Sequence, residues 1–139
     1  MIDSNGIGLA APQVHLSYKM FILREPEIEE NENIKISVLI NPIVEKITDE
    51  TEDDWEGCLS IPDMLGLVRR YKKIKYSALD INGNKISKEV EGIHARVIQH
   101  EFDHLNGVLY TSRLVHKSAF GFYDEIEKFW KNNNEEKSK

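Results

Sequence analysis

Residues 92–107 read GIHARVIQHEFDHLNG. Apolar side chains recur there at helical spacing on two adjacent stripes, and so wide an apolar surface predicts a buried helix. Asn106 and Gly107 are typical of a helix C-terminus. Inside the predicted helix stands the pattern H-E-x-x-H, formed by His100, Glu101 and His104 with two residues between the last two.

The two histidines of this pattern predict a metal site. His100 and His104 are four residues apart, so they share one helical face and both imidazoles can bind one divalent metal ion. Glu101 would then stand beside the water of that metal. Two imidazoles and a carboxylate are costly to bury without partners, which argues against unrelated histidines in an apolar helix.

A catalytic metal commonly has three protein ligands and one open position, so a third ligand is needed. The metzincin pattern would put a third histidine at position 110, where this chain has Tyr110. The best candidate is Cys58, the only cysteine, within EGCLSIP at residues 56–62. The other candidates are His15, His94, His116, Glu125 and Glu127.

The bulk composition indicates one globular domain. The chain has 139 residues, of which 40% are hydrophobic and 30% charged. A net charge of -6 and a pI near 5.4 argue against a general nucleic-acid binder. The sequence shows neither a membrane span nor an export signal, and a single cysteine cannot form an internal disulfide.

Alternation of apolar and polar residues predicts the strands, at residues 18–23, 34–40, 44–47, 71–81 and 85–90. Asn41-Pro42 is expected to end the second strand, and Asn82-Gly83 to form a hairpin turn between the last two. An acidic turn is expected at residues 49–54. Helical spacing of apolar residues predicts a last helix over Phe120–Trp130.

These elements predict an α+β fold. Antiparallel strands would pack around a buried central helix that carries the H-E-x-x-H pattern, with a further C-terminal helix. We expect residues 1–131 to form a single catalytic domain and residues 132–139 to be a polar, disordered tail.

Three segments resemble the signature motifs of peptide deformylases, in the order and with similar spacing to those of the family. They are GIGLAAPQ at residues 6–13, EGCLS at residues 56–60 and QHEFDHLNG at residues 99–107. The resemblance extends from Ser4 to Arg113. Family members usually carry a segment with a helix ahead of the first motif, and we expect this chain to lack that helix.

The resemblance implies a function and a set of catalytic residues. It implies a hydrolase that removes the formyl group from the N-terminal formylmethionine of nascent polypeptides, with a metal ion held by Cys58, His100 and His104. Glu101 is implied as the general acid and base, which would take a proton from water and deliver it to the departing amine. The donors implied for the oxyanion are the Leu59 backbone N–H and the Gln13 side-chain amide.

The substrate site is implied by the same resemblance. Gly8 would let an extended substrate pass close to the backbone as an added strand, with Ile7 and Gly57 beside it. Ile93 and Val97 would help line an apolar pocket for the methionine side chain. Core packing is a nearly equal explanation for these two residues, which share the helical stripe of His100. Arg70 resembles a position where the family often has an arginine near the substrate backbone.

A thiolate with two imidazoles suits zinc, cobalt, nickel or ferrous iron, and the resemblance implies ferrous iron. The expected partners are a formylated nascent chain and the ribosome, with neither nucleic acid nor membrane bound directly. The expected location is a bacterial cytoplasm, and an organelle stays open.

Two other functions stay open from the sequence. One is a zinc endopeptidase in which Glu125 or Glu127 replaces Cys58 as the third ligand. The other is an inactive deformylase-like module that binds peptide termini.

Overall fold

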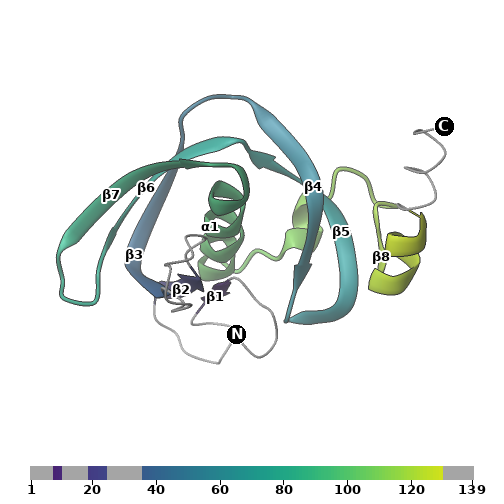
Figure 1. Cartoon of the computed structure of the whole chain (residues 1–139), viewed down its shortest axis with the longest axis horizontal. Coiled ribbons are helices and arrows are strands. Elements are labelled where there is room, and N and C mark those ends of the chain that lie inside the picture. Colours follow the sequence, from purple (N-terminus) through teal and green to yellow (C-terminus); the bar gives the residue numbers. More distant parts are fainter. Residues whose placement is uncertain (1–7, 11–18, 25–35, 130–139) are drawn as a thin grey trace, which may run out of the picture. The chain divides into compact units, whose positions relative to one another are not determined.

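The computed structural model describes residues 8–10, 19–24 and 36–129 (Figure 1). The chain divides into two compact units. The first combines Met1–Glu52 with Arg70–Leu109, and the second combines Asp53–Arg69 with Tyr110–Lys139. The expected tail at residues 132–139 lies outside the described residues, and the single domain over residues 1–131 stays a prediction.

The first unit is built on an antiparallel sheet with the strand order β1-β2-β3-β6-β7. Its strands are β1 (Gly8–Ala10), β2 (Met20–Arg24), β3 (Ile36–Lys46), β6 (Lys73–Leu79) and β7 (Lys85–Glu91). Helix α1 (Gly92–Leu105) packs against this sheet and contacts all five strands. The predicted arrangement of antiparallel strands with one helix that carries the H-E-x-x-H pattern is confirmed for this unit.

The hairpin between β6 and β7 forms as the sequence predicts. Gly83 has a φ of 81°, which a turn at this point requires. The Asp80 side chain accepts hydrogen bonds from the backbone N–H groups of Asn82 and Asn84, at 2.9 and 2.8 Å. The turn therefore sets the register in which Leu79 pairs with Lys85.

Strand β3 corrects one prediction. The sequence places a break at Asn41-Pro42, whereas β3 runs continuously through both residues. The register against β6 shifts between Ile40 and Ile43, and Asn41 adopts a φ of 49°. Such a bulge accommodates a proline, which has no N–H to donate to the neighbouring strand.

The core of the first unit lies between the sheet and α1. Alternate residues of β6 are buried, namely Ile74, Tyr76 and Ala78, as the sequence predicts. The helix contributes Ala95 and Ile98, both fully buried. The strands β2 and β3 complete the cluster with Phe21, Leu23 and Leu39.

The second unit contains most of a three-stranded sheet with the order β4-β5-β8. Its strands are β4 (Thr51–Cys58), β5 (Ile61–Tyr71) and β8 (Phe120–Phe122), and the 3-10 helix η2 (Tyr110–Arg113) precedes β8. The acidic turn expected at residues 49–54 is therefore shorter, because β4 begins at Thr51. The predicted C-terminal helix is present over residues 123–129, but β8 occupies the three residues assigned to its start.

The packing of this unit depends on Gly66. A Cβ atom at that position would lie 2.5 Å from Leu114 Cδ2 and 3.0 Å from the Tyr110 ring. Tyr110 is buried, and its ring also packs against Phe120. The strand can approach these side chains so closely only because residue 66 has no side chain.

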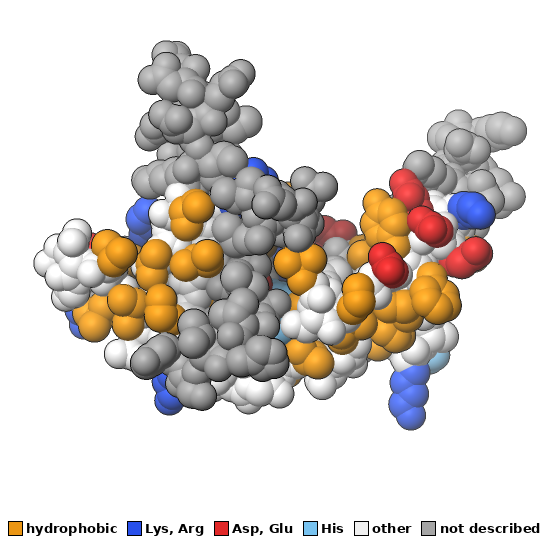
Figure 2. Space-filling view, turned by 90° about the horizontal axis from the view of Figure 1, so that it is seen from below, with side chains coloured by type: hydrophobic (Ala, Val, Ile, Leu, Met, Phe, Trp, Pro, Cys, Tyr) orange, Lys and Arg blue, Asp and Glu red, His pale blue; other side chains and the backbone are white. Residues whose placement is uncertain are grey.

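The end of the described chain carries exposed apolar side chains. They are Phe122, Tyr123 and Phe129. Figure 2 shows apolar surface next to acidic side chains on the right, where Figure 1 places β8 and the following helix. Among the described residues, no helix is both long and apolar enough to cross a membrane.

Candidate metal centre and active site

Helix α1 presents the H-E-x-x-H pattern, with both histidines in the protein interior. The helix follows β7 directly and ends where the sequence predicts. Asn106 donates its backbone N–H to Asp103 O, and Gly107 donates its own to His104 O. His100 and His104 are 9% and 7% exposed. The local sequence therefore fixes both imidazoles on one rigid element.

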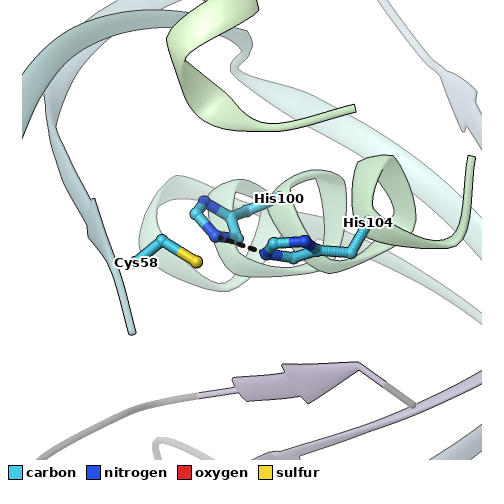
Figure 3. A group of neighbouring side chains, drawn as sticks. All are labelled: Cys58, His100 and His104. Carbon is cyan, nitrogen blue, oxygen red and sulfur yellow. Dashed lines mark hydrogen bonds between the residues drawn. The ribbon is translucent and has the colours of Figure 1, made fainter. Parts of the chain in front are cut away.

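The geometry of the histidine pair fits two ligands of one metal ion. The Nε2 atoms of His100 and His104 lie 3.2 Å apart, and the rings meet edge to face (Figure 3). Two nitrogens at the usual zinc–nitrogen distance of about 2.05 Å, in a tetrahedral arrangement, would be about 3.3 Å apart. The observed spacing differs from this value by only about 0.1 Å.

Glu101 lies next to His100 in the same buried segment. Glu101 is only 4% exposed, although its side chain carries a carboxyl group. A carboxylate is rarely buried in a helix without a specific role, because desolvation disfavours its charged form. Its position beside the histidine pair agrees with the expected general acid and base.

Cys58 belongs to the second unit, where it is the last residue of β4 and is half-buried. The described residues contain one group of His, Cys, Asp and Glu side chains that could hold a metal ion, and its members are Cys58, His100 and His104. Figure 3 draws these three side chains. A thiolate and two imidazoles are a ligand set that zinc and ferrous iron accept.

The other candidates for a third ligand have different surroundings. His94 packs its ring against Tyr76, and His116 interacts with the Ser118 side chain. Glu125 and Glu127 lie in the helix at residues 123–129 and do not belong to the group above. His15 lies outside the described residues.

Tyr110, which occupies the position of the third metzincin histidine, is a packing residue. Burial raises the pKa of Tyr110 to about 12, and the negative charges of Cys58 and Glu56 contribute further. Its phenol therefore stays neutral at physiological pH. A neutral buried phenol that packs against Phe120 serves the core of the second unit rather than a metal ion.

The predicted substrate residues differ in how much the structure says of them. Ile7 and Gln13 lie outside the described residues. Gly8 is the first residue of β1, where it pairs with Leu23 in an outer strand of the sheet. In the second unit, a Cβ atom on Gly57 would lie 3.2 Å from Leu65 Cδ2 and 3.3 Å from Met64 O, so close packing requires a small residue there.

The remaining site residues show contrasting exposure. Leu59, directly after Cys58, is 48% exposed, so its side chain is not a core side chain. Ile93 is 69% exposed, which removes core packing as its explanation. Val97 is half-buried and packs against the core of the first unit.

Arg70 is buried, and its Nη1 donates a hydrogen bond to Asp103 Oδ2 at 2.5 Å. The sequence reasoning missed this pair and also the buried Gln99, which bonds to the backbone of Tyr71. The sequence held a partial signal, because Gln99 and Asp103 are polar residues four positions apart in a segment that is predicted to be a buried helix.

Comparison with known proteins identifies the family. A model of the polypeptide deformylase family matches residues 1–119. The chain belongs to the peptide deformylase family. Among its relatives, Peptide deformylase 1 of Nitrosomonas europaea is 46% identical over 129 residues, which are 91% of this chain and 73% of that protein.

Solved deformylase structures share the fold. The structure of peptide deformylase from Thermotoga maritima matches with a TM-score of 0.74 and 40% identity, over 84% of this chain and 74% of that one. A class I type b peptide deformylase from Acinetobacter baumannii, solved with Met-Ala-Ser bound, matches with a TM-score of 0.72 and 36% identity, over 82% and 74% of the two chains.

These matches confirm the predicted family, fold class and activity. As a member, the chain is a metal-dependent hydrolase that removes the N-formyl group from nascent peptides. The comparisons lend no support to the endopeptidase or to the inactive module.

Proposed function

We propose that this chain deformylates peptides with a metal ion held by Cys58, His100 and His104. The observation that carries the proposal is the 3.2 Å spacing of the two Nε2 atoms, which matches that of neighbouring ligands of one tetrahedral metal ion. Cys58 supplies the chemistry of the third ligand. The remaining position would be open to water and substrate.

We propose ferrous iron as the physiological metal, with zinc, nickel or cobalt as alternatives that the same ligands accept. A divalent metal ion would supply a Lewis acid that polarises the formyl carbonyl and lowers the pKa of water toward neutrality. Iron and a ligating thiolate can both be oxidised, so the active protein has to be prepared without oxygen.

Glu101 would move the proton. Its carboxylate takes a proton from the water that attacks the formyl carbon, and returns it to the amine nitrogen as the C–N bond breaks. The products are formate and a peptide with a free N-terminal methionine. The burial of Glu101 beside His100 supports this role, because a general acid and base must be held within reach of the reacting groups.

Two donors would stabilise the oxyanion that forms on the formyl carbon. One is the backbone N–H of Leu59, which directly follows the proposed ligand Cys58 in the chain. The other is the side-chain amide of Gln13. Donors fixed before the reaction cost no reorganisation when the charge develops, which is why such groups contribute strongly to catalysis.

The substrate would bind as an extended chain along β1. This strand lies at one end of the sheet order and begins with Gly8, so a peptide could add beside it by backbone hydrogen bonds. Ile7 and Gly57 would adjoin the same path. Ile93 and Val97 would face the methionine side chain, and the exposure of Ile93 supports a pocket role over a core role. The Arg70 contact with substrate stays a prediction.

The setting of the reaction follows from the substrate. Formylated nascent chains leave the ribosome in the bacterial cytoplasm, so we propose that compartment and a transient encounter with the ribosome. The relatives named above are bacterial, which favours this location over an organelle.

The proposal is tested by formate release from a formyl-Met tripeptide. The protein is prepared anaerobically, and its bound metal is quantified in the same sample. We expect turnover with about one metal ion per chain. A chain that binds metal and releases no formate would contradict the proposed activity, and a chain that turns over without bound metal would contradict the proposed ligands.

A further inference from the structure

Each metal-site histidine of α1 is preceded by a buried polar residue. Gln99 stands before His100, and Asp103 stands before His104. Their exposed fractions are only 8% and 6%. Because they are four residues apart, they share a helical face that is rotated by one residue from the face of the histidines.

Both polar residues bind the same short stretch of chain, the dipeptide Arg70-Tyr71. The Gln99 side-chain amide accepts a hydrogen bond from the Tyr71 N–H at 3.0 Å and donates one to the Tyr71 carbonyl at 2.8 Å. Asp103 accepts a hydrogen bond from the Arg70 guanidinium within a buried ion pair. Two residues one helical turn apart, Gln99 and Asp103, therefore bond to the same dipeptide.

We infer that Gln99 and Asp103 are positioning residues that fix the direction in which His100 and His104 point. The inference rests on the metal site proposed above. A single tie would leave the helix free to pivot, whereas two ties one turn apart hold its rotation about its own axis. The bonds of Gln99 are directional in the same way as those of a β-ladder, since one amide satisfies both the N–H and the carbonyl of one residue.

The magnitude shows why rotation matters. An atom about 6 Å from the helix axis moves by about 1 Å when the helix turns by about 10°. Metal–ligand distances tolerate only about 0.2 Å. A small rotation of the helix would therefore displace both imidazoles relative to the third ligand by more than this tolerance. The distance between the two imidazoles would hardly change.

Arg96 provides a matched control on the same helix. It also ties α1 to a backbone, because its Nη2 donates a hydrogen bond to Glu52 O at 2.6 Å. This tie lies on an exposed part of the surface and adjoins neither histidine in sequence. Its removal tests whether any weakened helix contact would have the same effect.

The test compares metal affinity among folded variants. Gln99→Met and Asp103→Asn each keep the side-chain volume, and Arg96→Met serves as the control. Each protein is freed of metal, its thermal unfolding is recorded, and its zinc dissociation constant is measured below the unfolding range by competition with a chromophoric chelator. The visible spectrum of the cobalt-loaded protein reports the ligand geometry independently of activity.

We expect Gln99→Met and Asp103→Asn to weaken zinc binding by about 10- to 100-fold, the usual loss when the support of a metal site is removed. Their cobalt spectra should change, while Arg96→Met keeps the affinity and spectrum of the unmodified chain. If Asp103→Asn fails to fold, the uncharged Gln99→Met decides the matter.

Two results would overturn the inference. The first is unchanged zinc affinity in folded Gln99→Met and Asp103→Asn, which would leave both residues a purely structural role. The second is an equal loss in Arg96→Met. Failure of the unmodified chain to bind zinc or cobalt would instead overturn the proposed metal site, and this inference with it.

Discussion

Glu101 is the side chain on which the proposed proton transfer depends. Replacement by glutamine keeps its size and removes its basicity. For Glu101→Gln we expect formate release to fall by about 100- to 10,000-fold in kcat, the usual contribution of a general acid and base. Bound metal should stay close to that of the unmodified chain, because Glu101 is not a proposed ligand.

The same substitution at an exposed position controls for the loss of charge. Glu89 lies on β7 and is exposed, so Glu89→Gln should leave kcat unchanged. A Glu101→Gln protein that keeps its metal and turns over at the normal rate would show that another group moves the proton.

The raised pKa of Tyr110 leads to a prediction of how the free energy of unfolding changes with pH in the alkaline range. Burial raises its pKa to about 12 in the folded chain, against about 10 in an unfolded one. Well below pH 10 both states keep the phenol neutral, so the free energy of unfolding does not depend on this group there. As the pH rises from about 10 toward 12, the unfolded chain ionises first, and the free energy of unfolding falls.

Urea unfolding at a series of pH values measures this effect. Tyr110→Phe removes the titrating group, so it should lose less stability than the unmodified chain between pH 9 and about 11. Parallel curves for the two proteins over this range would show that Tyr110 does not have the raised pKa.

Among the secondary-structure elements, β5 carries a prediction about packing. A methyl group on residue 66 would lie 2.5 Å from Leu114 Cδ2, closer than Cβ atoms come to other heavy atoms, and in a tight contact of 3.0 Å with the Tyr110 ring. We expect Gly66→Ala to lower the free energy of unfolding by about 1–3 kcal/mol, as overpacking of a core does. Chemical denaturation measures this value, and Gly83→Ala is an unsuitable comparison because its φ is positive.

Gly121→Ala provides the control for this prediction. The nearest atom to its added Cβ would be Ile126 Cδ1 at 3.4 Å, an ordinary contact. A Gly66→Ala protein as stable as Gly121→Ala would contradict the close approach of β5 to η2.

Elements with local sequence signals could be predicted well. Helix α1 has apolar residues at helical spacing and an Asn-Gly stop, and the β6–β7 hairpin has its Asn82-Gly83 turn. The continuity of β3 could not be predicted, because a proline such as Pro42 normally ends a strand. In this structure a β-bulge between Ile40 and Ile43 accommodates the proline within the strand. Strand β8 pairs with β5 across a long sequence separation, which local periodicity does not report.

The site shows the same division between local and distant information. His100, Glu101 and His104 are recognisable because their spacing on one helix carries the chemistry. The spacing of Gln99 and Asp103 is visible in the sequence, but the partner of Asp103, Arg70, depends on the fold and has no local signal. The sequence alone therefore assigned no role to the two variable positions of H-E-x-x-H. One of them is Asp103, which we propose as a positioning residue.

For the molecule as a whole, metal removal should lower stability. A ligand that binds only the folded chain, at a free concentration 100 times its dissociation constant, adds about 2.7 kcal/mol to the free energy of unfolding. In a chain of this size the melting temperature should fall by roughly 5–10 °C when the metal is chelated. Calorimetry before and after chelation measures the shift, and restored zinc should reverse it.

The Cys58→Ala variant is the control for this shift. It lacks one proposed ligand, so chelation should change its melting temperature much less. Equal shifts in the two proteins would mean that the stabilising metal binds elsewhere.

The central claim is that one thiolate and two imidazoles hold the catalytic metal. The absorption spectrum of the cobalt-loaded chain, recorded beside that of Cys58→Ala, tests it most directly. We expect a thiolate-to-cobalt charge-transfer band in the near ultraviolet for the unmodified chain, together with intense visible bands of a tetrahedral site, and loss of the charge-transfer band in the variant. The same spectrum in both proteins would contradict ligation by Cys58 and would require another residue as the third ligand.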